Sequence, residues 1–311
     1  MNVSRRTLLK AGGAAALISP LAGFSHAEAQ VESKASFRFG VIADPQFAPV
    51  PNSYGVKTRY YSNSVWKLNE AIAHLNREEL EFVITLGDMV DRYWESFQHV
   101  LPLYDGLKHE KFFLLGNHDF TTPNHSLQTL VRTVGMPAPY YDFVRHGYRF
   151  IVLDGNEISL FALPDGDPRR ALAERRLVEL KTSGAKNAQS YNGSLSDTQF
   201  EWLRQKVQEA VIADQKIIIF NHYPVYPVHE TNAWDSERLI KLVTDTPNIV
   251  AYFNGHNHAG NYGQTEGKHF LTFRGMVETP IDTAYAIVEV LPNRLEVKGF
   301  GLQESRTLKF T

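Results

Sequence analysis

The sequence predicts an α/β fold, in which short buried strands alternate with helices. Short apolar runs, typical of central strands buried on both faces, lie at 82–86, 112–115, 217–220 and 249–253, and residues 37–43 also have the pattern of a strand. Segments with a single apolar helical face lie between several of these runs. The chain has 311 residues, of which 43% are hydrophobic and 21% charged, so a single domain can bury a sizeable core.

The first half of the chain gives a regular order of elements. Residues 44–61, after the first strand, form a loop that contains Pro, Asn and Tyr. A helix is predicted over about 64–78, because one of its faces carries Val65, Leu68, Ile72 and Leu75. Residues 140–155 indicate two strands that join at His146-Gly147.

The second half begins with a weakly patterned, charged segment. Residues 155–193 are interpreted as an insertion on the core, with a helix around 169–182. Ser196 and Gln199 form a capping-box pattern, which predicts that the next helix begins there. Three further strands are expected near 269–274, 284–291 and 295–300.

Composition excludes some classes of ligand and chemistry. The formal net charge is −2 and no run of Lys or Arg is present, so a nucleic acid polymer is not an expected partner. The sequence contains no Cys. A bound metal must therefore have oxygen and nitrogen ligands, and a thiolate nucleophile is excluded.

The N-terminus has the pattern of a targeting segment. Arg5 and Arg6 precede a short apolar run, and Ala27-Glu28-Ala29 is a candidate cleavage site. Residues 1–29 resemble a twin-arginine export signal, so residues 30–311 are expected to form one catalytic domain that the twin-arginine machinery exports. The product would be periplasmic or secreted, without a stable membrane anchor. A disordered basic N-terminus and an uncleaved anchor are the alternatives.

Residue types that bind metals follow five of the predicted strands. The five segments are Asp44-Pro45-Gln46, Gly87-Asp88-Met89-Val90-Asp91, Gly116-Asn117-His118-Asp119, Asn221-His222 and Gly255-His256-Asn257-His258. Taken singly, an Asp after a strand is often a turn or capping residue, and a lone His is often structural. As an ordered set they predict one shared site, because ligands bind where the carboxyl ends of strands meet.

The same residue types suit two-metal chemistry. Two cations that share one carboxylate can activate water and offset the charge on phosphoryl oxygens during in-line attack. An imidazole beside them could donate a proton to the leaving oxygen. No serine or cysteine nucleophile is needed for such a reaction.

These five segments, in this order, resemble those of the calcineurin-like metallophosphoesterases, and the resemblance covers nearly all of the chain after residue 29. It implies a two-sheet β-sandwich flanked by helices, with four layers and a dinuclear metal centre. Asp44, Gln46 and His258 would bind the first metal, Asp88 both metals, and Asn117, His222 and His256 the second. His118 would stand beside the scissile phosphate as an acid or charge stabiliser, supported by Asp119 and Asp91.

One residue departs from the wider superfamily, which mostly has His where this sequence has Gln46. An amide oxygen is harder than an imidazole nitrogen and favours Mn²⁺ or Mg²⁺ over Zn²⁺ or Cu²⁺. Asp-x-Gln is the form found in the Mn²⁺-dependent ADP-ribose/CDP-alcohol diphosphatases. Further segments resemble that family: 59–64, 82–91, 192–203, 221–227, 255–263 and 277–286. The resemblance implies two divalent ions, Mn²⁺ foremost and Mg²⁺, Fe or Zn²⁺ as alternatives.

The same resemblance implies hydrolysis of the diphosphate linkage in small nucleotide-sugar or nucleotide-alcohol compounds such as ADP-ribose and CDP-choline. In the loop after the first strand, Tyr54 could stack on a nucleobase and Arg59 could contact a phosphate; alternatively both are ordinary surface residues. Two other functions remain open for this sequence. One is a cyclic-nucleotide phosphodiesterase or broad phosphomonoesterase that uses the same site, and the other is a non-catalytic periplasmic nucleotide-binding protein.

Overall fold

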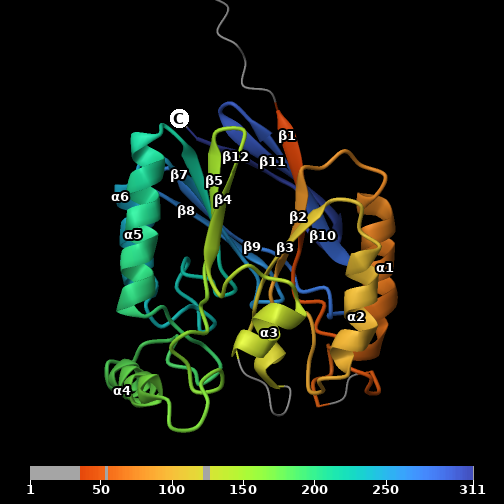
Figure 1. Ribbon diagram of the computed structural model, residues 1–311, viewed down its shortest axis with the longest axis horizontal. Coiled ribbons are helices and arrows are strands. Elements are labelled where there is room, and N and C mark those ends of the chain that lie inside the picture. Colours follow the sequence, from red (N-terminus) through yellow and green to blue (C-terminus); the bar gives the residue numbers. More distant parts are fainter. Residues whose placement is uncertain (1–35, 53–54, 122–126, 311) are drawn as a thin grey trace, which may run out of the picture. The chain divides into compact units, whose positions relative to one another are not determined.

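The computed structural model describes residues 36–52, 55–121 and 127–310, and these residues belong to one compact unit. Its strands form two six-stranded mixed sheets (Figure 1). The first contains, in spatial order, β12 (Arg306–Lys309), β11 (Arg294–Gly301), β10 (Ala284–Leu291), β1 (Phe37–Ile42), β2 (Phe82–Leu86) and β3 (Glu110–Leu114). The second contains β4 (Tyr141–Arg145), β5 (Tyr148–Val152), β6 (Lys216–Phe220), β7 (Ile249–Asn254), β9 (Lys268–Thr272) and β8 (Asn261–Thr265).

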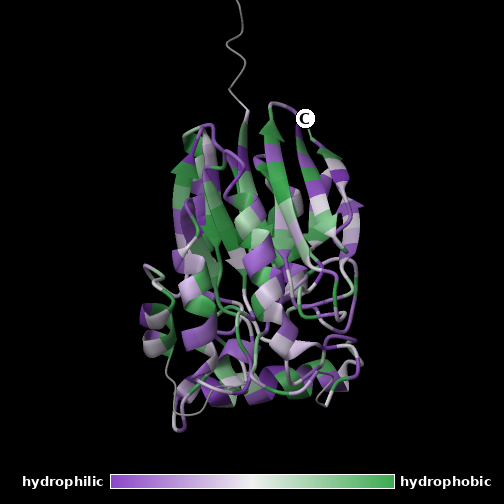
Figure 2. Cartoon of the chain, turned by 90° about the vertical axis from the view of Figure 1, so that its right-hand side faces the viewer, coloured by the Kyte–Doolittle hydropathy of each residue, from purple (hydrophilic) through white to green (hydrophobic). Residues whose placement is uncertain are grey.

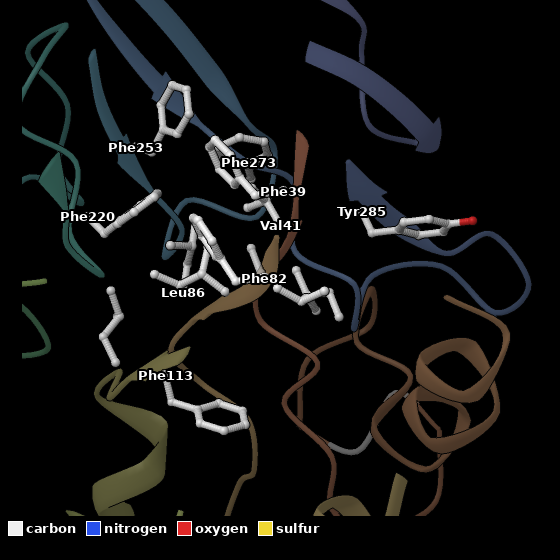
Figure 3. Close-up of a cluster of buried hydrophobic side chains, with 14 of the residues drawn as sticks. Phe39, Val41, Phe82, Leu86, Phe113, Phe220, Phe253, Phe273 and Tyr285 are labelled. Atoms are coloured by element: carbon white, nitrogen blue, oxygen red, sulfur yellow. The ribbon is translucent and has the colours of Figure 1, made fainter. Parts of the chain in front are cut away.

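The two sheets face each other across an aromatic core. Phe39 of β1 stacks on Phe82 of β2 at a ring-centroid distance of 4.8 Å, and it forms edge-to-face contacts with Phe150 and Phe220 of the second sheet. Figure 3 shows Phe220 and Phe253 pointing from the second sheet toward the side chains of the first. Because successive side chains of a strand point to opposite faces, the alternate residues of β5–β7 face outward, toward the helices.

Helices cover the outer faces of both sheets. In the described part of the chain the α-helices are α1 (Ser64–Leu75), α2 (Ser96–Asp105), α3 (Leu127–Thr133), α4 (Pro168–Thr182), α5 (Asp197–Ile212) and α6 (Ser236–Asp245). Figure 1 shows α1 and α2 beside the first sheet, and α5 and α6 beside the second. The predicted β-sandwich flanked by helices is therefore confirmed.

Several elements differ from the sequence-based expectation. Helices α2, α3 and α6 and the edge strands β8 and β12 were not predicted. The N-cap of α5 is Ser196, whose hydroxyl accepts from Gln199 N at 3.0 Å, as the capping pattern requires. The reciprocal half of a capping box does not form, because Gln199 Oε1 accepts from Asp154 N and Ser196 N donates to Glu157 Oε2, each at 2.9 Å.

The sheet topology brings the polar strand ends together. β1, β2 and β3 run parallel in the first sheet, and β5, β6 and β7 run parallel in the second. Their carboxyl ends therefore lie at one edge of each sheet, where loops replace the hydrophobic strands (Figure 2).

Among the described residues, no helix is both long and apolar enough to cross a membrane. The segment 1–29, expected to be an export signal, lies outside the described residues.

Candidate metal centre and active site

Backbone strain marks the strand ends that carry the predicted ligands. Asp44, Gln46, Asp88 and His256 all have positive φ angles, of 48°, 46°, 48° and 65°. Such conformations are uncommon for residues other than glycine and cluster at functional sites. The tight turns that follow β1, β2 and β7 thus direct buried polar side chains into the space between the sheet edges.

Two clusters of potential ligands share one carboxylate. Asp44, Asp88 and His258 form the first, and Asp88, His222 and His256 form the second. Within each cluster the ligand atoms lie within 4.8 Å of one another. Asp88 therefore occupies the position that a carboxylate shared by two cations requires.

The side-chain amides of Gln46 and Asn117 lie beside the two ligand clusters. The Gln46 side chain is fully buried, and its Nε2 donates to Asp91 Oδ2 at 3.2 Å. Its Oε1 accepts no hydrogen bond from any described residue, and the same is true of Asp88 Oδ2. Asn117 Oδ1 lies 3.1 Å from His222 Nε2. Buried oxygens without donors are costly, and a cation at each cluster would satisfy them.

The three clustered histidines are oriented by hydrogen bonds on their outer nitrogens. His222 Nδ1 lies 2.8 Å from the Leu86 carbonyl, His256 Nε2 3.0 Å from Asn192 Oδ1, and His258 Nδ1 2.8 Å from Glu278 Oε1. Each partner is an acceptor, so each outer nitrogen carries the proton. The inner nitrogens face the carboxylates, as expected for histidines that bind metals through one nitrogen and donate through the other.

The charges of the cluster also fit cations. Burial opposes ionisation of Asp88, but the charges of His222 and His118 outweigh it and hold the pKa of this carboxyl below its usual range. Burial lowers the pKa of His222, yet Asp88 and Asp44 raise it to about 9. Burial and the neighbouring His222 hold the pKa of His256 well below its usual value. His222 Nε2 and His256 Nδ1 lie 3.1 Å apart, and a cation bound at the cluster would take the place of a proton shared by the two rings.

The donor set therefore fits a pair of divalent cations. Carboxylate and amide oxygens predominate around the first cluster, while the second adds two imidazoles, and the chain has no thiolate. Oxygen and nitrogen ligands of this kind suit Mn²⁺ and related ions.

His118 lies beside the clusters and is partly exposed. Its Nδ1 is 3.3 Å from Asp91 Oδ2, and its Nε2 accepts from Arg59 Nη1 at 3.3 Å. Although burial raises the pKa of Asp91, its hydrogen bond with His118 lowers it below the usual range. Asp91 thus orients the imidazole through Nδ1, and Arg59 lies against the other ring nitrogen, Nε2.

The other two predicted residues have different positions. Asp119 is fully buried, and its two oxygens accept from Val90 N and Gly116 N at 3.1 and 2.9 Å. Burial and the charge of Asp88 raise the pKa of Asp119 to about 8. Asp119 therefore stabilises the loop that carries Asn117 and His118. Tyr54 lies outside the described residues.

A cavity of about 710 Å³ opens above the clusters. Its lining includes Arg59, His118 and Glu278, together with the aromatic residues Phe161 and Tyr191. The two aromatic residues belong to the 155–193 segment, interpreted from the sequence as an insertion, so this segment forms a wall of the cavity.

Sequence reasoning did not assign roles to Asn192, Glu278 and Asn156. The first two lie in segments that resemble the diphosphatases outside the metal-binding motifs, and that resemblance was their only signal. Asn156 follows β5; its amide donates to the Leu115 carbonyl and accepts from the Tyr223 hydroxyl, both at 2.7 Å. It thus links the strand end that precedes Asn117 to the residue that follows His222.

The ends of the parallel strands in the two sheets thus present a shared carboxylate, three histidines and two amides in an arrangement that suits a two-metal centre. The profile of the calcineurin-like phosphoesterase family matches residues 37–260. The chain belongs to this family and is a hydrolase, as the sequence resemblance implied.

Comparison with individual proteins shows which members of this family the chain is similar to. A rice protein named manganese-dependent ADP-ribose/CDP-alcohol diphosphatase is 30% identical, over 85% of this chain and 91% of its own length. The human protein of the same name is 27% identical, over 89% of this chain and 94% of its own length. A crystal structure of a dimetal phosphatase from Danio rerio superimposes with a TM-score of 0.80 at 24% identity, covering 88% of this chain and 99% of that one.

Proposed function

We propose that this chain hydrolyses the diphosphate linkage of nucleotide-sugar or nucleotide-alcohol compounds, such as ADP-ribose and CDP-choline, with Mn²⁺ as the preferred cation. The observation that carries the proposal is the pair of ligand clusters joined by Asp88 beneath the cavity. The near full-length similarity to diphosphatases of this specificity supports the choice of substrate.

The proposed ligands are those expected from the sequence. Asp44, Gln46 and His258 would hold the first cation, Asp88 both, and Asn117, His222 and His256 the second. When bound, two divalent cations supply the activation of water and offset the negative charge of the phosphoryl oxygens.

Side chains around the centre would supply the proton transfer and the phosphate contact that the reaction needs. Water attacks one phosphorus and loses a proton, the bond from that phosphorus to the bridging oxygen breaks, and the departing phosphate keeps the electron pair. His118, oriented by Asp91, would donate a proton to that departing oxygen. Arg59 would move its hydrogen bond from His118 Nε2 to a phosphoryl oxygen, which frees that nitrogen to take up a proton from solvent and donate it to the departing oxygen.

The cavity has room for more than the diphosphate. A volume of about 710 Å³ is in the range of small-molecule sites. Phe161 and Tyr191 offer apolar ring surface to a nucleobase or an alcohol group. The aromatic contact first expected from Tyr54 is thus available from the 155–193 segment.

A substrate panel with a His118→Ala variant tests the proposal. With Mn²⁺, the wild-type protein should release AMP from ADP-ribose and CMP from CDP-choline, with little action on cyclic AMP or a simple monoester. His118→Ala should keep both metals but lose about a hundredfold or more in kcat, because it removes help to the transition state rather than a ligand. Asp88→Ala should instead lose metal. Preferred cleavage of monoesters or cyclic nucleotides, or equal metal loss in both variants, would contradict the assignment.

We also propose that residues 1–29 are a twin-arginine export signal and that residues 30–311 work as the catalytic domain in the periplasm or outside the cell. The paired arginines, the short apolar run and Ala27-Glu28-Ala29 support this. The twin-arginine route exports folded proteins, which suits an enzyme that acquires its metals before export.

A further inference from the structure

Glu278 contacts two components of the proposed active site at once. Its Oε1 lies 2.8 Å from His258 Nδ1 and 3.7 Å from Arg59 Nε. His258 presents its other ring nitrogen, Nε2, to Asp44 Oδ1 at 3.6 Å. One carboxylate therefore lies between a proposed ligand of the first metal and the arginine that faces the phosphate.

The backbone around Glu278 is held on two sides. Met276 N and Val277 N donate to the carbonyls of Ala43 and Asp44, each at 3.0 Å. On the other side, Tyr60 N donates to the Val277 carbonyl at 2.9 Å. The segment therefore spans the gap between the end of β1, where Asp44 lies, and the loop that carries Arg59.

A buried lysine also forms hydrogen bonds with the backbone of the same segment. Lys67 of α1 is fully buried, and its ammonium donates to the carbonyls of Met276, Glu278 and Thr279, the last two at 3.0 and 3.1 Å. An ammonium has three donors and is costly to bury unless all are satisfied. Thr279 has a φ of +63°, a strained conformation for a β-branched residue. The lysine thus holds a turn that would otherwise be unfavourable.

We propose that Glu278 is a positioning residue of the first metal site: it fixes His258 as a ligand and aims Arg59 at the phosphate, and Lys67 holds it in place. The inference rests on the metal ligands and on the phosphate contact in the proposed function. A carboxylate on the outer nitrogen fixes the ring orientation and makes the imidazole a more basic ligand. His256 has the neutral Asn192 amide in that position, so the two metal sites should differ in their sensitivity to this charge.

Glu278→Gln is the sharpest test, because it keeps the shape and an acceptor oxygen but removes the charge. Mn²⁺ binding is followed by isothermal titration calorimetry and by electron paramagnetic resonance, without substrate. We expect one of two Mn²⁺ sites to weaken by about 10- to 100-fold and the other to keep its affinity. With ADP-ribose, raising Mn²⁺ should restore most of kcat, while KM stays above the wild-type value because Arg59 has lost its carboxylate.

Two variants serve as comparisons. Glu304→Gln neutralises an exposed carboxylate that pairs with Arg274, and it should change neither Mn²⁺ affinity nor KM. Lys67→Met should weaken the same Mn²⁺ site as Glu278→Gln; if Lys67→Met does not fold, the isosteric Glu278→Gln alone decides.

Wild-type affinity at both sites in Glu278→Gln, or equal weakening of both, would overturn the inference. Because the Mn²⁺ titration needs no substrate, a wild-type protein that binds two Mn²⁺ but leaves ADP-ribose intact would refute the proposed function while this inference still stands or falls on the titration.

Discussion

Gly116 lies where the end of β3 meets the proposed metal centre, and we predict that Gly116→Ala disables the enzyme without unfolding it. A Cβ built on Gly116 would lie 2.2 Å from Asp88 Oδ1 and 2.5 Å from His222 Cε1. The neighbouring backbone is equally close, since Asp88 N would lie 2.6 Å away. Only a hydrogen atom fits between β3 and the shared carboxylate.

The size of the effect follows from the distances. Ordinary contact with a Cβ begins near 3.4 Å, so Asp88 Oδ1 would have to move by about 1 Å. That oxygen also accepts from His118 N at 2.8 Å, so the shift would disturb both the carboxylate and the loop of the proposed acid. A misplacement of about 1 Å in a catalytic group costs on the order of a hundredfold in rate. We therefore expect kcat/KM to fall by about that factor, together with weaker Mn²⁺ binding.

The assay is steady-state hydrolysis of ADP-ribose at several Mn²⁺ concentrations, with metal content and thermal unfolding measured on the same samples. Gly106→Ala is the matched control, because Gly106 is the C-cap residue that follows α2, has a helical φ of −76° and is not among the clustered residues. It should keep activity and Mn²⁺ binding. A folded Gly116→Ala protein with wild-type kcat/KM and metal content would refute the placement of Asp88 as the shared ligand.

Three further predictions concern the metal, the pH dependence of stability and the N-terminus. Gln46→His replaces the buried amide oxygen with an imidazole nitrogen, so activity should shift from Mn²⁺ toward Zn²⁺ or Co²⁺; identical metal profiles would remove Gln46 from the site. Burial raises the pKa of Asp154 to about 7, so the folded state favours the protonated carboxyl and the free energy of unfolding should fall by about 2.5 kcal/mol between pH 5 and 8. Denaturant unfolding should show that this decline is absent in Asp154→Asn, and an equal decline in both proteins would count against it. Replacing Arg5 and Arg6 by Lys should leave unprocessed protein in the cytoplasm, and cell fractionation that finds normal export would contradict the signal.

The positions of the proposed ligands could be predicted from the sequence because strand ends are local features. An apolar run followed by Asp88 or by Asn117 and His118 needs only neighbouring residues to be recognised. Parallel strands have their carboxyl ends at one edge of a sheet, so ligands that are far apart in the sequence converge there, and the packing of the two sheets joins the two sets. Gln46, in place of the His that most of the superfamily has, is predicted from chemistry alone to be a harder ligand, because it offers an amide oxygen instead of an imidazole nitrogen.

The short helices and edge strands were harder to predict. Helices α2 and α6 have ten residues each, so they show fewer than three turns of periodicity, and α2 contains Pro102, which usually ends a helix. Edge strands β8 and β12 have only five and four residues. Their partners β9 and β11 hold them in place, and pairing between strands leaves little trace in local composition.

The sequence by itself determined the fold class, the strand ends that carry the metal-binding residue types, and the family. Only the tertiary structure decided how those residues are oriented: which nitrogen of His256 and His258 faces the centre depends on Asn192 and Glu278. It also decided that a buried ammonium, Lys67, supports the segment of Glu278 from more than two hundred residues away. The physical reason is that hydrogen bonds between distant segments depend on position in space, whereas periodicity and motif spacing record only what lies nearby along the chain.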